Sequence, residues 1–186
     1  MRAIETDRAW IKELSEARAE DNWAFYRYLK ESDLSPEGID AVVHRLSREI
    51  PAQIECSTCL NCCKQLSPCL DAEELEELSR AVGMAASEFI AAYLVEEDEF
   101  NGFVVKGRPC PFLADAGCLL GAHRPRDCAS YPHLEKDGFV FRLMTVIANC
   151  AICPIVFNVY EALKETLWHT ASLEDPDWVG DGDDAR

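Results

Sequence analysis

The sequence predicts a mainly helical α+β protein, in which helices surround a small β-hairpin or sheet and cysteine-rich loops. Two observations predict the helices: apolar residues recur at helical spacing over several segments, and capping or stop signals stand at the ends of these segments. The ten cysteines predict the loops, since most of them fall in short runs bracketed by prolines. With 186 residues, of which 48% are hydrophobic, the chain can bury the core of one domain. We expect that domain over residues 1–170, followed by a loose acidic tail at 171–186.

The N-terminal part of the chain predicts two helices. The first runs from about residue 6 to 30, where apolar side chains recur among charged ones. The second begins after Ser35, an N-cap residue that is followed by Pro36, and it ends at Pro51. Its apolar stripe consists of Ile39, Val42, Val43, Leu46 and Ile50.

Two further helices are predicted after the first cysteines. Asp71 and Glu74 have the spacing of a capping box, and Gly83 stops the helix that they begin. A short helix is expected over about residues 87–95. The acidic residues 96–99 are interpreted as its solvated end.

Two segments predict strands. Residues 103–106 read Phe-Val-Val-Lys and precede the turn residue Gly107. Residues 138–147 carry the strongest strand pattern of the chain, because they are rich in Phe, Val and Leu. After them, Pro154 opens a final helix. These strands account for the small hairpin or sheet of the predicted fold.

The charge of the chain limits its partners. There are 34 acidic and 18 basic residues, so the formal net charge is −16. This charge repels nucleic-acid phosphates and anionic membranes, and we expect neither as a partner. A basic protein partner or a metal donor fits the charge, and so does simple solubility.

The N-terminal segment favours a cytoplasmic protein. Residues 1–10 are polar and charged, with no apolar core of a signal peptide, and the chain has no apolar run of about 18 residues. In the cytoplasm thiols stay reduced. The ten cysteines therefore favour metal ligation over a disulfide framework.

The densest cysteine run is Cys56-x2-Cys59-x2-Cys62-Cys63. Thiolates separated by two residues can turn toward one soft metal ion, and C-x2-C-x2-C is how iron–sulfur proteins present three thiolates from one loop. Cys62 and Cys63 are adjacent, and adjacent side chains usually point in different directions. Either one of them has another role, or the loop feeds two sites or one polynuclear cluster.

The later cysteines are expected to complete the metal sites. The predicted ligands are Cys56, Cys59, Cys62, Cys63, Cys110, Cys118, Cys128, Cys150 and Cys153. We expect at least one cysteine-ligated site that joins the first run to Cys110, Cys118 and Cys128, with Cys150 and Cys153 in a second site. Nine thiols suit two four-coordinate sites, or one [4Fe–4S] cluster with five cysteines to spare. The tenth, Cys69, is interpreted as a buried apolar residue.

Basic residues close to these ligands are candidates for the second layer of the site. Four thiolates around Zn²⁺ leave a net charge of −2, which Arg124, Arg126, Arg108 and Lys64 would offset. The alternative for Arg124 is that it caps a turn. His123 and His133 flank Cys128 and are candidate ligands or hydrogen-bond donors, because imidazole suits both zinc and iron.

The order of these motifs resembles the CxxCxxCC family, whose members are described as zinc- or iron-chelating or as iron–sulfur-cluster-containing proteins (the YkgJ-like group). The resemblance covers about residues 54–133. It rests on the first cysteine run, on Cys110-Pro111-Phe112-Leu113, on Cys118, and on Arg124-Pro125-x2-Cys128-x2-Tyr131-Pro132. It implies metal binding and no particular reaction. Cys69 departs from the pattern.

Two classes of function follow. The first is a metal-binding protein that holds an iron–sulfur cluster or zinc in an electron-transfer, redox or metal-chelating role, or as a purely structural zinc interaction module. The second is a metal-dependent modification enzyme that acts on a protein partner and needs an open coordination position. The excess of cysteines favours closed sites, and the C-x2-C-x2-C run favours iron over zinc.

Overall fold

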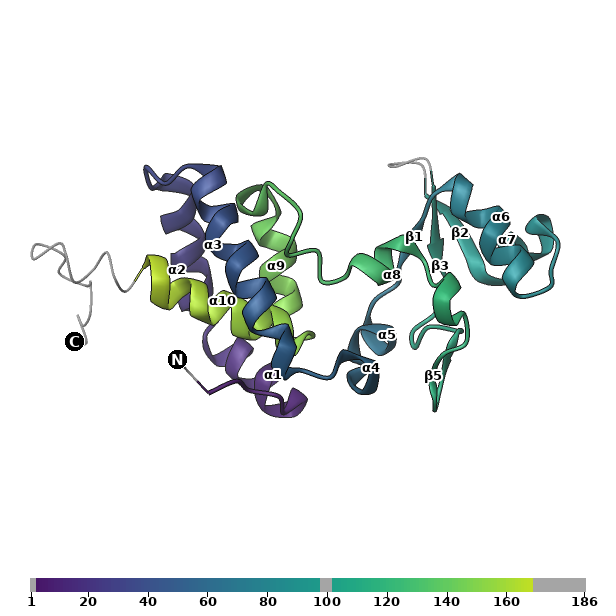
Figure 1. Cartoon of the computed structure of the whole chain (residues 1–186), viewed down its shortest axis with the longest axis horizontal. Helices are drawn as coiled ribbons and strands as arrows, with labels where there is room; N and C mark the ends of the chain where they lie inside the picture. Colours follow the sequence, from purple (N-terminus) through teal and green to yellow (C-terminus); the bar gives the residue numbers. More distant parts are fainter. Residues whose placement is uncertain (1–2, 98–101, 169–186) are drawn as a thin grey trace, which may run out of the picture. The chain divides into compact units, whose positions relative to one another are not determined.

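The computed structural model describes residues 3–97 and 102–168, and the contacts within the chain divide it into two compact units (Figure 1). The helical unit consists of Met1–Ile50 together with Glu135–Arg186, and the cysteine unit consists of Pro51–Leu134. Eight of the ten cysteines lie in the cysteine unit. Two compact units can still fold as one domain, so a single domain over residues 1–170 stays a prediction. The predicted tail at 171–186 lies outside the described residues.

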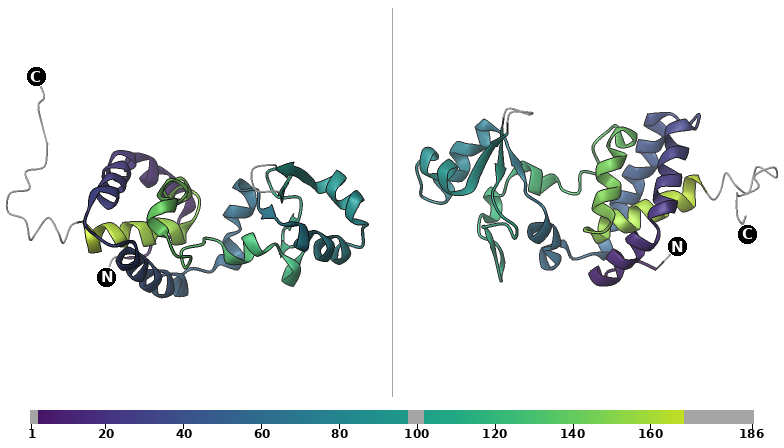
Figure 2. Two further views of the ribbon diagram at one scale, coloured as in Figure 1. Left: turned by 90° about the horizontal axis from the view of Figure 1, so that it is seen from above. Right: turned by 180° about the vertical axis from the view of Figure 1, so that it is seen from behind.

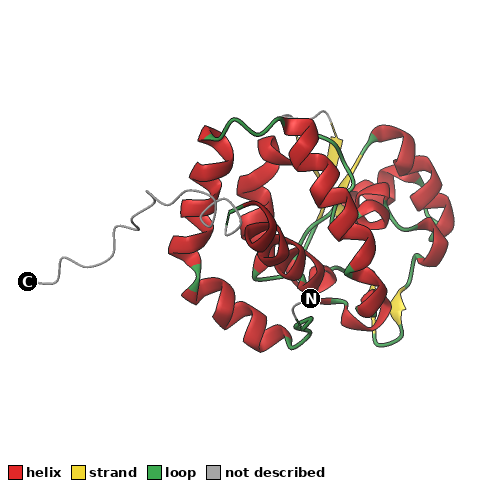
Figure 3. Ribbon diagram, turned by 60° about the vertical axis from the view of Figure 1, so that its left-hand side comes forward, coloured by secondary structure: helices red, strands yellow, loops and turns green. Residues whose placement is uncertain are grey.

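Helices make up most of the described chain, and strands make up a small part of it (Figure 3). The helical unit contains α1 (Arg8–Ala17), α2 (Ala19–Glu31), α3 (Pro36–Glu49), a 3-10 turn over Phe139–Arg142, α9 (Leu143–Cys150) and α10 (Pro154–Leu167). Helix α10 packs against α1, α3 and α9, and ten of its residues are buried (Figure 2). The core of this unit therefore surrounds its last helix.

The sequence predicted one helix over about residues 6–30, and the structure divides it into α1 and α2. Arg18 separates the two, because its backbone leaves the helical region at φ −100° and ψ 18°. Its guanidinium forms an ion pair with Glu161 of α10. The Arg18 carbonyl still accepts the Asn22 N–H at 2.9 Å, so the interruption is a single turn. The prediction for α3 is confirmed: Ser35 Oγ accepts the Gly38 N–H at 3.1 Å, and Pro36 is the first helical residue.

The predicted strand over residues 138–147 is wrong. This segment forms the 3-10 turn and the start of α9. Buried Asp40 of α3 accepts the N–H groups of Gly138 at 2.7 Å and of Phe139 at 2.9 Å, which provides a cap for the helical turn. A short apolar run fits a buried helix as well as a strand, and here the helical spacing buries Phe139, Leu143 and Val146. The final helix does open at Pro154, as predicted.

The cysteine unit combines short helices with a small antiparallel sheet. Its strands β1 (Cys69–Leu70), β3 (Gly102–Val105) and β2 (Leu94–Glu97) pair in this spatial order, and β4 (Leu113–Ala114) pairs with β5 (Gly117–Cys118). Its helices are α4 (Cys56–Cys59), α5 (Asn61–Gln65), α6 (Ala72–Ala81), α7 (Ala86–Tyr93) and α8 (Arg126–Ser130). The predicted mainly helical α+β class is therefore confirmed.

Local signals correctly predict helix α6 and strand β3. Asp71 accepts the Glu74 N–H at 2.9 Å, and Glu74 accepts the Asp71 N–H at 3.2 Å, which is the predicted capping box. Gly83 ends the helix with φ +71°. Residues 96–99 were predicted as a solvated helix end, but Glu96 and Glu97 belong to strand β2 (Leu94–Glu97), with Glu96 exposed, and residues 98–99 lie outside the described residues. Buried Leu94 pairs there with Val105.

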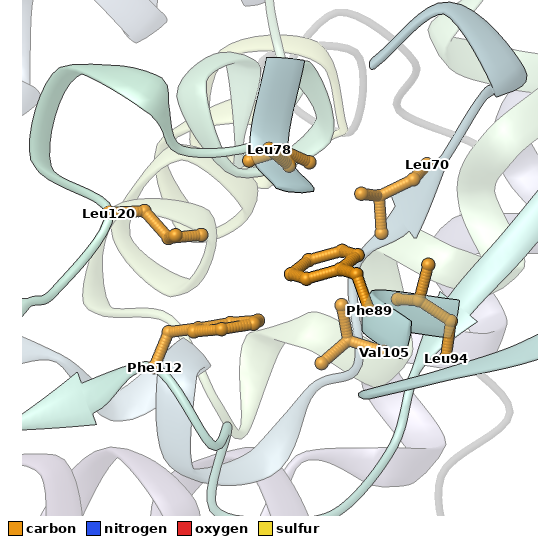
Figure 4. Close-up of a cluster of buried hydrophobic side chains, with 7 residues drawn as sticks. All are labelled: Leu70, Leu78, Phe89, Leu94, Val105, Phe112 and Leu120. Carbon is orange, nitrogen blue, oxygen red and sulfur yellow. The ribbon is translucent and has the colours of Figure 1, made fainter. Parts of the chain in front are cut away.

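Between α6, α7 and the sheet lies the apolar core of the cysteine unit (Figure 4). It consists of Leu70, Leu78, Phe89, Leu94, Val105, Phe112 and Leu120. The Phe89 and Phe112 rings stack with their centroids 5.9 Å apart. This core fixes the segments that precede and follow the cysteines.

No helix within the described residues is long and apolar enough to cross a membrane.

Candidate metal centre

The first cysteine run forms two very short helices. Leu60 joins α4 to α5 in the left-handed conformation, with φ 51°, and this reverses the chain between Cys59 and Cys62. On α5, the Sγ atoms of Cys62 and Cys63 lie 4.0 Å apart. Cys56 is exposed, and the other three thiols of the run are half-buried. Four sulfur atoms are thus presented within two helical turns.

Cysteines that are distant in the sequence lie next to Cys63. The Cys110 N–H donates a hydrogen bond to the Cys63 carbonyl at 2.8 Å, so the backbone itself connects the first run to the second. Cys118 lies in β5, opposite Leu113. Cys128 is the third residue of α8. All three thiols are half-buried.

Charges on several cysteines act on the same thiols. Burial, then the Asp127 charge and the charges of Cys63, Cys110 and Cys118 raise the pKa of Cys128 to about 12. Burial also raises the pKa of Cys110, to which charges on Cys63 and Cys118 contribute. Cys63 and Cys110 are thus joined by a backbone hydrogen bond, and charges on Cys63, Cys110 and Cys118 act on the Cys128 thiol.

Cys63 also belongs to the group formed by the first run. Burial and then a charge on Cys59 raise the pKa of Cys56, the Arg124 guanidinium lowers it, and a charge on Cys63 raises it again. Cys63 is thus the thiol shared by the first run and the second. In residues 3–97 and 102–168, however, no three His, Cys, Asp or Glu side chains are grouped in a way that could hold a metal ion. The thiols are near one another without forming a finished coordination shell.

The third C-x2-C pair lies in the helical unit. Cys150 is the last residue of α9, and Cys153 precedes α10. The exposed fractions are 1% for Cys150 and 7% for Cys153. Burial raises the pKa of Cys150, while the nearby Lys164 ammonium lowers it. Their predicted role in a second metal site stays a prediction.

The comparison with protein families matches residues 55–154 to the family CxxCxxCC, "Putative zinc- or iron-chelating domain". The match covers more than half of the chain and includes all ten cysteines. The chain belongs to the CxxCxxCC family. The resemblance in the cysteine motifs is therefore confirmed, and membership supports a metal ion as ligand. Neither the search of curated proteins nor that of solved structures returned a match.

The interpretation of Cys69 as a buried residue is wrong. Cys69 is exposed. It lies in the edge strand β1, where it pairs with Val104. Its backbone N–H donates a hydrogen bond to Asp127 Oδ2 at 3.0 Å. Alternation along the strand places Leu70, and not Cys69, in the core.

The four predicted basic residues have different surroundings. The charge of Arg124 acts on the Cys56 thiol. Arg126 forms ion pairs with Asp71 at 3.1 Å and Glu73 at 3.5 Å at the start of α6. Arg108 Nε donates to Ser67 Oγ at 3.3 Å, and Lys64 is exposed on α5. A role in offsetting thiolate charge is best supported for Arg124.

The two candidate histidines also differ. His123 Nδ1 lies 3.2 Å from Glu77 Oε1 on the exposed side of α6. His133 has partners on both ring nitrogens, Asp127 Oδ1 at 3.0 Å from Nε2 and Ser130 Oγ at 3.0 Å from Nδ1. Sequence reasoning missed this connected Asp127–His133–Ser130 group. The three-residue spacing of its members was the available signal, but the connection depends on the positive φ of His133, 60°.

Proposed function

We propose that this protein binds iron as an iron–sulfur cluster through the thiolates of its cysteine unit and serves in electron transfer or another redox role. The observation that carries the proposal is the position of Cys63. This residue ends the C-x2-C-x2-C-C run, its carbonyl accepts the Cys110 N–H at 2.8 Å, and its charge acts on the thiols of Cys56 and Cys128. Several thiolates from one loop with a remote partner are the usual ligands of such clusters.

The number of thiols supports a cluster over a single zinc ion. Seven predicted ligands lie in the cysteine unit, at Cys56, Cys59, Cys62, Cys63, Cys110, Cys118 and Cys128. One tetrahedral zinc ion uses four. Cys62 and Cys63 are adjacent, and a polynuclear centre can use both because adjacent residues need not bind the same metal ion.

One observation supports zinc as the second candidate. The four thiols at Cys63, Cys110, Cys118 and Cys128 interact with one another and come from separate segments. A closed zinc site with four cysteine ligands is built in the same way and would make this unit a structural or metal-chelating module. The excess of thiols argues against the open coordination position that a metal-dependent modification enzyme needs.

The surroundings of the proposed centre follow from its chemistry. Free thiolates are required for metal binding, so we place the protein in the reducing cytoplasm. The net charge of −16 favours a basic protein as the redox partner or metal donor.

Metal analysis of anaerobically purified protein tests the proposal. We expect iron and acid-labile sulfide in equal amounts, with broad visible absorption. Cys63→Ser and Cys128→Ser should each lose most of the iron. Cys69→Ser is the matched control and should retain the iron, since the charges that act on this exposed thiol are carboxylates rather than other thiols. Stoichiometric zinc without sulfide or colour would replace the cluster by the zinc site.

A further inference from the structure

Asp127 immediately precedes Cys128 and uses both of its carboxylate oxygens. Oδ2 accepts the Cys69 N–H at 3.0 Å, across 58 residues of sequence, and Oδ1 lies 3.0 Å from His133 Nε2. One side chain thus connects α8 to strand β1 and to the turn that follows α8. A carboxylate that accepts two hydrogen bonds is fixed in both position and orientation.

His133 is held in place by two contacts with Ser130, the last residue of α8. Its N–H donates to the Ser130 carbonyl at 2.8 Å, and its Nδ1 lies 3.0 Å from Ser130 Oγ. The positive φ of 60° is uncommon for a residue with a side chain, although His, Asn and Asp adopt it more readily than others. This conformation turns the imidazole back toward α8, where it meets Asp127.

The first residue of α8 is fixed independently. The Arg126 N–H donates to buried Glu74 at 2.6 Å, while its guanidinium pairs with Asp71 and Glu73. Helix α8 has five residues, too few to be stable alone, and none of them is buried. Its position therefore depends on these polar contacts.

We infer that Asp127 and His133 are positioning residues of the metal centre, which hold α8 so that the Cys128 thiolate reaches the ligands contributed by Cys63, Cys110 and Cys118. This inference rests on the proposed metal-binding function. It assigns to the Asp127–His133–Ser130 group the role that hydrogen-bonded outer partners have around metal ligands in general.

Ser130, His133 and Asp127 are connected like the nucleophile, base and orienting acid of a catalytic triad. Their hydrogen bonds do not fit that use. Ser130 Oγ donates its single proton to the Arg126 carbonyl at 2.8 Å. The serine proton is thus directed to that carbonyl rather than to His133 Nδ1, where a base would take it. The group is therefore structural in its chemistry.

The test compares Asp127→Ala with Asp127→Asn in the full chain, purified without oxygen. The asparagine oxygen can still accept the Cys69 N–H, and its NH2 can donate to a neutral His133. Loss of bound metal to excess EDTA should be about 10-fold or more faster for Asp127→Ala and within about threefold of the wild-type rate for Asp127→Asn. His133→Asn, which tolerates the positive φ, should lie between them. The control His123→Asn should lose metal at the wild-type rate.

Hydrogen exchange of the Cys69 amide gives a second readout that needs no metal. It should be faster by about an order of magnitude in Asp127→Ala and close to wild type in Asp127→Asn. If purified wild-type protein holds no metal, the proposed function is overturned, but the exchange rate of the Cys69 amide still tests the positioning role. Equal metal loss in wild type and Asp127→Ala, an unchanged Cys69 amide, or labelling of Ser130 by a fluorophosphonate would overturn the positioning role.

Discussion

The helical unit and the cysteine unit are stabilised in different ways. In the helical unit, α10 is buried along most of its length, and Phe25, Val43, Val159 and Leu163 are fully enclosed. The cysteine unit has an apolar core on the side of α6, α7 and the sheet. Its cysteine-bearing helices α5 and α8 contribute no buried residue to it. The comparison teaches that apolar packing holds the scaffold, whereas the short helices α5 and α8 are positioned by polar contacts.

Removal of the metal should give the largest difference between the two units. Because binding of a metal to such ligands is coupled to local folding, excess chelator should loosen α5 and α8. We expect their amides to exchange about 100-fold faster or more, while those of α10 stay unchanged. Hydrogen exchange with and without EDTA measures this. Equal protection of α5 and α8 in both conditions would contradict it.

Truncation of one core should destabilise one unit selectively. Phe89→Ala removes the ring that stacks on Phe112 and should cost about 3–5 kcal/mol in the cysteine unit. Phe25→Ala should cost a similar amount in the helical unit. All four tryptophans lie outside Pro51–Leu134, so tryptophan fluorescence reports on the helical unit alone, and circular dichroism reports on both. A shift of the fluorescence transition by Phe89→Ala would show that the stability of the helical unit depends on that of the cysteine unit.

The pH should affect metal binding at the cysteine unit. Burial and neighbouring charges raise the pKa of Cys128 to about 12, so its thiol is protonated at neutral pH and must lose the proton to bind metal. The metal-bound state holds fewer protons, and affinity should therefore rise with pH, by about tenfold per pH unit for each proton released. Competition titration with zinc between about pH 6 and pH 8 measures the slope. Cys128→Ser should reduce that slope by one proton, and an unchanged slope would remove Cys128 from the ligands.

A smaller effect is expected in the helical unit when its polar cap is removed. Asp40 accepts the N–H groups of Gly138 and Phe139, and Asp40→Ala should cost about 1–2 kcal/mol. Asp40→Asn, which keeps an acceptor oxygen, should cost less. Denaturation followed by tryptophan fluorescence measures both variants, and equal losses would mean that the charge rather than the hydrogen bonds matters.

The smallest effect should come from Cys69→Ser. Its side chain is exposed and its main contact, with Asp127, is made by the backbone, so the expected change in unfolding free energy is below about 0.5 kcal/mol. Metal content should be the same as in wild type. Loss of metal in this variant would add Cys69 to the ligands and change the count on which the proposed centre depends.

Signals that depend on neighbouring residues could be predicted from the sequence. Ser35, the Asp71–Glu74 box and Pro154 begin helices as expected, because a cap is made within one turn of chain. The segment at 138–147 could not be predicted in this way. Its helical form depends on Asp40, about a hundred residues earlier, and its apolar run suits either structure.

The candidate site shows the same division. Its cysteines are evident from their spacing, but their grouping around Cys63 depends on how α8 and the segment at Cys110 return to α5. The exposure of Cys69 follows from the register of β1 against β3. The role of His133 depends on a backbone conformation that no sequence pattern specifies.

The cysteine unit, Pro51–Leu134, is an insertion between two segments that together form the helical unit. While the insertion is folded, it holds its two ends at a fixed separation. If it unfolds completely, it becomes a flexible loop of 84 residues (134 − 51 + 1) that the helical unit must close. The loss of entropy on closing such a loop costs about 4 kcal/mol of free energy plus a constant. Chain connectivity by itself therefore links the stability of the helical unit to the folding of the cysteine unit.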